Sequence, residues 1–169
     1  MKSIVLKVLT VLVLLGVVAI VVVSVAKQQN MVVVVSGNHD KLPLEIELGK
    51  YQDSDCGMII DTIEYASQVV APNGRTWFFH DHGGMANWLS QRSFKDSAVI
   101  WVMSKDTNEW IDGKEAWYSR TDETPMLYGF GAYAQKQEGF VDFESMKQLM
   151  LQGQTLANPI IQRELLGSN

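Results

Sequence analysis

Cysteine is almost absent from this chain, since Cys56 is the single one among 169 residues. One cysteine excludes an intramolecular disulfide and a dithiol exchange centre. The sequence also has no Gly-x-Ser-x-Gly motif, no His-Glu-x-x-His motif and no phosphate-binding glycine loop. It therefore lacks the marks of a serine hydrolase, a zinc protease or a nucleotide-binding enzyme. These absences favour a binding protein over an enzyme.

Basic residues are scarce beyond the N-terminus. Residues 1–27 hold three lysines and no acidic residue, so the rest of the chain holds 11 basic and 19 acidic residues, a net charge of −8. A surface with this charge repels polyanions. We therefore expect neither nucleic acid nor anionic lipid as a partner.

A long hydrophobic run is present near the start, where 19 uncharged residues lie between Lys7 and Lys27. This run can cross a bilayer as a helix and is longer than the apolar stretch of most cleaved signal peptides. We expect residues 1–27 to form an uncleaved transmembrane anchor, although Ser24-Val25-Ala26 resembles a cleavage site. Lys2 and Lys7 favour a cytoplasmic N-terminus, which puts the remaining residues outside the cytoplasm.

Strand patterns follow the anchor. Residues 31–35 are rich in valine, and residues 42–48 alternate apolar and acidic side chains, as in a strand with one face in water. We therefore expect residues 28–52 to form a linker and an N-terminal hairpin. Residues 65–71 and 75–79 flank a Pro-Asn-Gly turn, which predicts a second hairpin.

A helix and a return strand are predicted next. Asp81 can cap a helix that runs to about residue 91. Residues 98–103 are apolar on both faces, which is typical of a strand covered on both sides. Together with the second hairpin, these elements predict a ββαβ unit over about residues 53–104.

The second half of the chain repeats part of this pattern, because the string Phe-x-Asp-x-x-x-Met occurs at both Phe79 and Phe140. We therefore expect a second unit over about residues 109–153, followed by a C-terminal helix over residues 158–167. The predicted fold class is α+β, with an N-terminal transmembrane helix followed by a small domain of two ββαβ-like units. The domain would extend over residues 53–169.

The single cysteine stands beside a methionine in the string Cys56-Gly57-Met58. In an extended chain both side chains point to the same face, and a thiolate with a thioether is half of a soft-metal site of the kind that Cu(I) prefers. The repeat sets Met126 in the place of Met58, because each methionine precedes a tyrosine by seven residues. A seam between the two units could gather these sulfurs around one ion.

Two further residues are candidate ligands. Met85 lies near the start of the expected helix, where it could equally be a core residue beside Trp88. His80 could supply an imidazole to copper. A complete hard-metal site is not expected here, since two histidines two positions apart share a face only in an extended chain and Asp81 is needed as the cap. A copper role and a plain packing role both stay open for these residues.

The stretch from Asp53 to about Gln135 resembles the NosL proteins, accessory copper-binding proteins for nitrous oxide reductase. The resemblance rests on the order and spacing of several motifs. The matching pieces are Cys56-Gly57-Met58-Ile59-Ile60, Tyr65-Ala66-Ser67-Gln68-Val69-Val70, Phe78-Phe79-His80-Asp81-x-Gly83-Gly84-Met85, Trp110-Ile111-Asp112-Gly113 with Glu115-Ala116, and Thr124-Pro125-Met126-x-x-Gly129.

The resemblance implies a periplasmic Cu(I) metallochaperone tethered to the bacterial inner membrane, with a fold similar to a lobe of organomercurial lyase. It implies nitrous oxide reductase, or the ABC-type membrane complex that assembles its copper centre, as the partner. It also implies Cys56, Met58 and Met126 as copper ligands. This chain differs from the usual family pattern, since its anchor is not a lipoprotein anchor and Asp53 and Gly84 stand where the family often has cysteines.

Two other functions remain open at the level of the sequence. A metal-free scaffold that organises a membrane respiratory assembly would use the motif residues in its core. An enzyme related to organomercurial lyase rests on fold analogy alone, and one cysteine is too few for that chemistry. We therefore expect a copper-binding protein that is not an enzyme.

Overall fold

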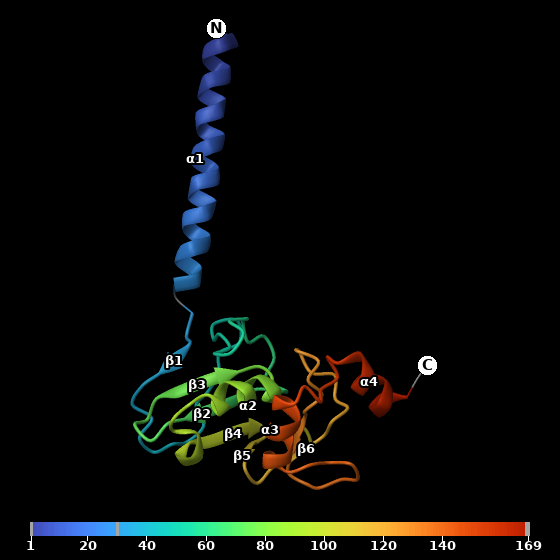
Figure 1. Cartoon of the computed structure of the whole chain (residues 1–169). Coiled ribbons are helices and arrows are strands. Elements are labelled where there is room, and N and C mark those ends of the chain that lie inside the picture. The colour runs from blue at the N-terminus through green and yellow to red at the C-terminus, as the bar shows by residue number, and fades with distance from the viewer. Residues whose placement is uncertain (1, 30, 168–169) are drawn as a thin grey trace. The chain divides into compact units, whose positions relative to one another are not determined.

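The computed structural model describes residues 2–29 and 31–167, so Met1 and Asn169, the outermost bounds of the expected anchor and domain, lie outside it. The chain divides into an N-terminal helical unit and a compact domain that starts at Val32 (Figure 1). Helix α1 runs from Lys2 to Gln29.

Within α1, Val5–Ala26 is long and apolar enough to cross a membrane. Its 22 residues rise about 33 Å at 1.5 Å per residue, against a bilayer core of about 30 Å. An isolated helix in water would leave the valine, isoleucine and leucine side chains of this segment exposed to solvent. The hydrocarbon core of a membrane would cover them. The expected N-terminal apolar helix of membrane-spanning length is therefore present.

The domain mixes short antiparallel strands with short helices, which confirms the α+β class. The strands form a five-stranded sheet in the order β1-β3-β2-β4-β5 and a separate pair, β6 with β7. The elements are β1 (Val34–Val35), β2 (Ser67–Val70), β3 (Thr76–Phe79), α2 (His82–Ser90), β4 (Val99–Met103), β5 (Trp110–Asp112), β6 (Trp117–Tyr118), β7 (Ala132–Tyr133), α3 (Phe143–Leu151) and α4 (Pro159–Leu166), with a 3-10 turn at Lys95–Ser97 before β4.

Strands β2 and β3 form the predicted hairpin around Pro72-Asn73-Gly74, with Val69 opposite Trp77. Gly74 has a φ of +78°, and a Cβ at this position would lie 3.0 Å from the backbone of Asn38. Glycine therefore meets both the left-handed conformation and the close approach of the neighbouring loop. The hairpin fixes the register of β3 and thereby the position of His80 and Asp81, the polar residues that directly follow it.

The sheet is covered on both faces, because its side chains alternate between two apolar clusters. Val69 and Phe79 belong to the larger cluster, to which α2 and α3 contribute from their places side by side on one face (Figure 1). Phe78 belongs to the second cluster, with Ile46 and Ile60 from the segment that covers the opposite face. The segment between Ile46 and Ile60 includes Cys56, so its packing on this face of the sheet also positions the loop around Cys56.

Helices α2 and α3 begin within the two copies of the repeated string. Around the first copy, β2, β3, α2 and β4 form a ββαβ unit, and around the second β6, β7 and α3 form a ββα unit that continues into α4 in the described residues. The side chain of Asp81 caps α2 and that of Asp142 caps α3. Met85 and Met146, four positions after these caps, are both fully buried. The predicted C-terminal helix is α4, which Asn158 caps.

The expected N-terminal hairpin over residues 28–52 is wrong. Strand β1 pairs with β3, and residues 42–48 form no strand. The buried side chain of Gln68 takes the place of a partner strand there, since its Oε1 accepts from the Leu44 N–H at 2.9 Å and its Nε2 donates to the Leu44 carbonyl at 2.8 Å. An amide side chain satisfies the same backbone groups that a strand would.

Candidate metal centre

A tight loop around Asp53 holds the single cysteine. The Asp53 N–H donates to the Met58 carbonyl at 2.8 Å, and the Gly57 N–H donates to the Asp53 carbonyl at 3.0 Å. Gly57 has a φ of +77°, which an L side chain rarely adopts. Cys56 therefore lies in a turn rather than in the extended chain that would point it to the same face as Met58.

The Asp53 carboxylate organises this loop from inside. Its Oδ1 accepts from the N–H groups of Asp55 at 2.7 Å and Cys56 at 3.0 Å. Its Oδ2 accepts from the His80 N–H at 2.8 Å and lies 2.6 Å from His80 Nδ1. Asp53 and His80 are both buried, whereas Cys56 is exposed. A buried acid therefore fixes the turn that presents the thiol and orients the imidazole beneath it.

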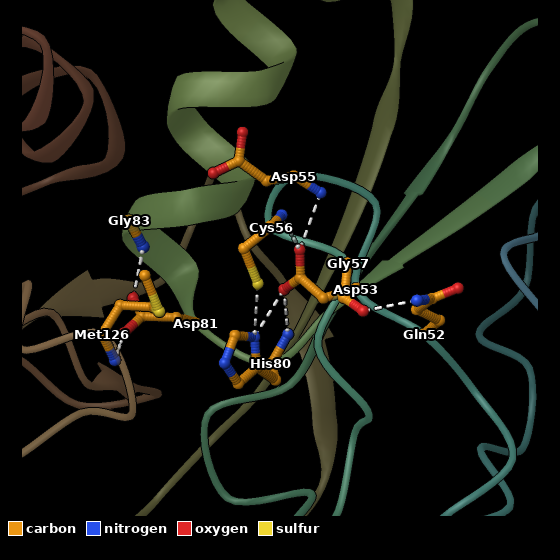
Figure 2. Close-up of polar contacts among 9 residues, drawn as sticks. All are labelled: Gln52, Asp53, Asp55, Cys56, Gly57, His80, Asp81, Gly83 and Met126. Carbon is orange, nitrogen blue, oxygen red and sulfur yellow. Dashed lines mark hydrogen bonds and ion pairs between the residues drawn. The ribbon is translucent and has the colours of Figure 1, made fainter. Parts of the chain in front are cut away.

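Asp53, Cys56 and His80 bring their ligand atoms within 4.8 Å of one another, so this cluster could hold a metal ion. Cys56 Sγ lies 3.9 Å from His80 Nδ1 (Figure 2). Sulfur and imidazole nitrogen ligands at about 2.3 and 2.0 Å from one ion are roughly 3.5 to 4.3 Å apart, for bond angles from tetrahedral to linear. The thiol and the imidazole are thus separated as two ligands of one ion are, and binding would require His80 Nδ1 to give up the proton that it shares with Asp53 Oδ2.

The electrostatics of the cluster favour a cation. Burial acts to raise the pKa of Asp53, but the hydrogen bonds from the His80 side chain and from backbone N–H groups outweigh it and lower that pKa. Burial acts to lower the pKa of His80, and the hydrogen bond and charge of Asp53 outweigh it and raise that pKa. Burial and the charges of Asp53 and Asp55 raise the pKa of the Cys56 thiol. A bound cation would replace protons in this anionic environment.

The two predicted thioether ligands lie at different places around the loop. Met58 is 44% exposed and directly follows Gly57. Met126 is half-buried, and its N–H donates to Asp81 Oδ2 at 3.0 Å, next to His80 in the chain. In the view of Figure 2 the Met126 side chain extends from this anchor toward Cys56 and His80. The second unit therefore places the Met126 backbone against Asp81, the residue after His80.

The structure does not bring the other predicted ligand, Met85, to the cluster. Met85 is fully buried in the main apolar core, because its position on α2 faces the sheet. His82 is also fully buried, between the rings of Tyr65 and Tyr118, and its pKa falls to about 3 because burial penalises the imidazolium. His82 is not part of the three-residue cluster.

Sequence reasoning missed Asp53 as a functional residue. A signal was present, since an aspartate two or three residues before a turn residue commonly accepts from the backbone ahead of it. What the sequence could not show is that the second oxygen of the same carboxylate would meet His80, 27 residues later. No protein-family model matches the chain, and no curated protein matches it. The chemistry of the site therefore rests on its own geometry.

Proposed function

We propose that this domain is a Cu(I)-binding metallochaperone that acts outside the cytoplasm, tethered by α1. One observation carries the proposal, namely an exposed thiol held 3.9 Å from an imidazole nitrogen by a buried carboxylate. The NosL-like order of motifs in the sequence supports the same function. The short N-terminal side with Lys2 and Lys7 supports a periplasmic location for the domain.

The choice of copper follows from the donors. Thiolate and thioether sulfurs select Cu(I), whereas calcium and magnesium prefer oxygen ligands. Met58 supplies a thioether two residues from Cys56 in the chain. Met126 supplies a second thioether from the segment whose backbone N–H donates to Asp81. A thioether binds a metal ion without losing a proton. A carboxylate stands at Asp53, where the resemblance often places a cysteine. Asp53 therefore acts by orienting His80 and completing the charge around the ion, while sulfur selects the metal.

Delivery requires a site that a partner can reach. Cys56 and Met58 are exposed, so an incoming ligand from an acceptor can displace them one at a time without unfolding the domain. Copper moves as Cu(I) throughout, and the Cys56 thiolate that it leaves regains a proton. We propose nitrous oxide reductase, or the ABC-type complex that assembles its copper centre, as the acceptor.

Copper titration of the full chain tests this function. In detergent micelles, under anaerobic and reducing conditions, the protein should remove one Cu(I) per chain from a chromogenic chelator. Cys56→Ser combined with Met126→Leu should abolish this uptake, and Met150→Leu in α3 serves as the matched methionine control. Zn(II) should not displace the bound Cu(I). Unchanged tight binding in the double variant would contradict the assignment of Cys56 and Met126 as copper ligands.

The alternatives make different predictions for the same residues. A metal-free scaffold would use Cys56 for packing, yet the thiol is exposed and a thiol-reactive probe should label it in the folded protein. An organomercurial lyase activity would appear as protonolysis of a carbon–mercury bond by the purified protein. We expect none, because the described cluster contains a single thiol.

A further inference from the structure

A cavity of about 840 Å³ lies beside the metal-binding loop. Three aromatic rings line it, since Trp77 stacks on Phe94 with centroids 5.3 Å apart and lies 5.1 Å from Trp88. Trp77 comes from β3, Trp88 from α2, and Phe94 from the turn after α2. The rings hold one another in place, so they form the wall of a preformed groove.

Two arginines complete this aromatic groove. The guanidinium of Arg92 lies 4.0 Å from the centre of the Trp88 ring, and that of Arg75 lies 4.9 Å from the centre of Trp77. Stacking of this kind fixes the plane of a guanidinium and leaves its edge N–H groups directed outward. Both arginines line the cavity.

Neither guanidinium has an ion-pair partner among the described residues, and Arg92 Nε is buried without a hydrogen-bond acceptor. A buried guanidinium N–H without a partner costs free energy that an incoming acceptor would recover. The groove therefore combines apolar walls with one buried guanidinium N–H that lacks an acceptor, on Arg92, and a second, exposed guanidinium, on Arg75.

We propose that the aromatic groove binds an acidic segment of a partner protein, with carboxylates paired to Arg75 and Arg92 and an apolar side chain against the partly exposed ring of Trp77. A carboxylate matches the planar fork of arginine and can bind it through two hydrogen bonds. Aromatic and arginine side chains are also the residues that most often dominate protein interfaces.

The groove adjoins the metal cluster through two short connections. Ser54 lines the cavity and directly follows Asp53, and Trp77 lies on β3, which ends one residue before His80. A partner segment seated in the groove would lie next to the exposed Cys56 thiol. The further step, that this partner is the copper acceptor, rests on the function proposed above.

A protein segment fits the groove better than a membrane surface. Membrane-binding aromatic residues project from a surface into the lipid, whereas Trp88 is only 6% exposed and its ring packs against Phe79 and Phe94. The groove therefore suits a chain that inserts into it.

Peptide titration of the full chain in uncharged detergent micelles tests the groove. The probe is a fluorescein-labelled, acetylated heptapeptide that carries four carboxylates around one phenylalanine, compared with the same peptide bearing four side-chain amides. By fluorescence anisotropy at low salt, the acidic peptide should saturate below about 1 mM and bind at least about tenfold tighter than the amide peptide. Equal binding of the two peptides, or no saturation, would overturn the proposal.

The variant R75E/R92E should weaken binding of the acidic peptide at least about tenfold. R163E makes one charge reversal of the same kind on the exposed surface of α4 and should bind as the wild type does. If the double variant fails to fold, R75Q/R92Q removes the charge and keeps a polar side chain, with the same expectation. Undiminished binding in a folded variant contradicts the assignment of the groove.

Two further measurements separate the alternatives. Glycerol phosphate should not displace the peptide, and displacement at equal concentration would assign the groove to an anionic headgroup. Copper stoichiometry of R75E/R92E should stay at one Cu(I) per chain. Peptide binding without copper uptake would refute the proposed function and leave the groove standing, whereas copper uptake without peptide binding would do the reverse.

Discussion

The two units of the domain begin their helices in the same way and connect those helix starts differently. Asp81 and Asp142 each accept a hydrogen bond from the backbone of the first helical turn. Asp142 is exposed and does nothing else, whereas Asp81 is fully buried and its second oxygen accepts from the Met126 N–H. The cap of the second unit therefore makes a local contact, whereas the cap of the first unit also binds the backbone of the second unit.

The units also differ in what precedes the cap. In the first, the Asp53 carboxylate turns the chain so that Cys56 faces outward beside His80. In the second, Thr124 stands in the place of Cys56, and its Oγ1 accepts from the N–H groups of Tyr128 and Gly129. One copy thus positions reactive side chains, while the other satisfies its own backbone. A repeat in sequence therefore predicts shared structure better than shared chemistry.

The comparison of caps predicts the largest difference in stability. Asp81→Ala removes the cap and leaves the Met126 N–H and the Thr124 hydroxyl unsatisfied in the interior, so it should lower the free energy of unfolding by about 3 to 4 kcal/mol. Asp142→Ala should cost about 1 kcal/mol. Chemical denaturation in detergent, followed by circular dichroism, measures both. Equal losses of stability in the two variants would show that the hydrogen bond between Asp81 and Met126 does not stabilise the domain.

The loop before the first cap should be almost as sensitive. Asp53→Asn sets an amide NH₂ where Oδ2 now accepts from the His80 backbone and ring, and should lower the free energy of unfolding by about 2 to 3 kcal/mol. Asp55→Asn is the matched control, because burial raises the pKa of Asp55 and its side chain accepts only from Asn87 at 3.3 Å among the described residues. A loss in the control as large as that in Asp53→Asn would contradict the structure.

Acid should destabilise the first unit through His82. The unfolded chain protonates this imidazole below its ordinary pKa of 6.5, but the folded chain does not until the pKa of about 3. The folded state therefore loses about 2 kcal/mol relative to the unfolded state between pH 7 and pH 5. His82→Phe should remove that part of the pH dependence, measured by denaturation at several pH values without metal. The exposed His39→Gln provides the control.

The smallest effect distinguishes two adjacent glycines at the start of α2. A Cβ on Gly83 would lie 2.6 Å from the Tyr128 side chain, whereas one on Gly84 would meet Asp55 at an ordinary 3.4 Å. Gly83→Ala should cost about 1 to 2 kcal/mol through overpacking, and Gly84→Ala should gain up to about 1 kcal/mol of helix propensity. Thermal unfolding midpoints should rank the variants in this order. A stabilised Gly83→Ala would mean that Tyr128 does not cover this helix start.

Local sequence was sufficient where neighbouring residues decide the structure. An uncharged run of membrane length predicts α1, Pro72-Asn73-Gly74 predicts its hairpin, and Asp81 and Asp142 predict their helices, because each signal acts within a few positions. The segment at residues 42–48 shows the limit. Its alternation is real, but the side chain of Gln68 replaced the strand partner that a pattern alone would assume.

The sequence by itself determined that a thiol and several thioethers stand near one another in a chain with an apolar N-terminal helix. Only the tertiary structure decided which groups meet. The register of β3 brings His80 beneath Cys56, and Asp53 fills the space between them. The fold also packs Met85 into the core and holds the Met126 backbone against Asp81. The physical reason is that a ligand set depends on contacts between residues far apart in the chain, and packing of the whole domain fixes those contacts.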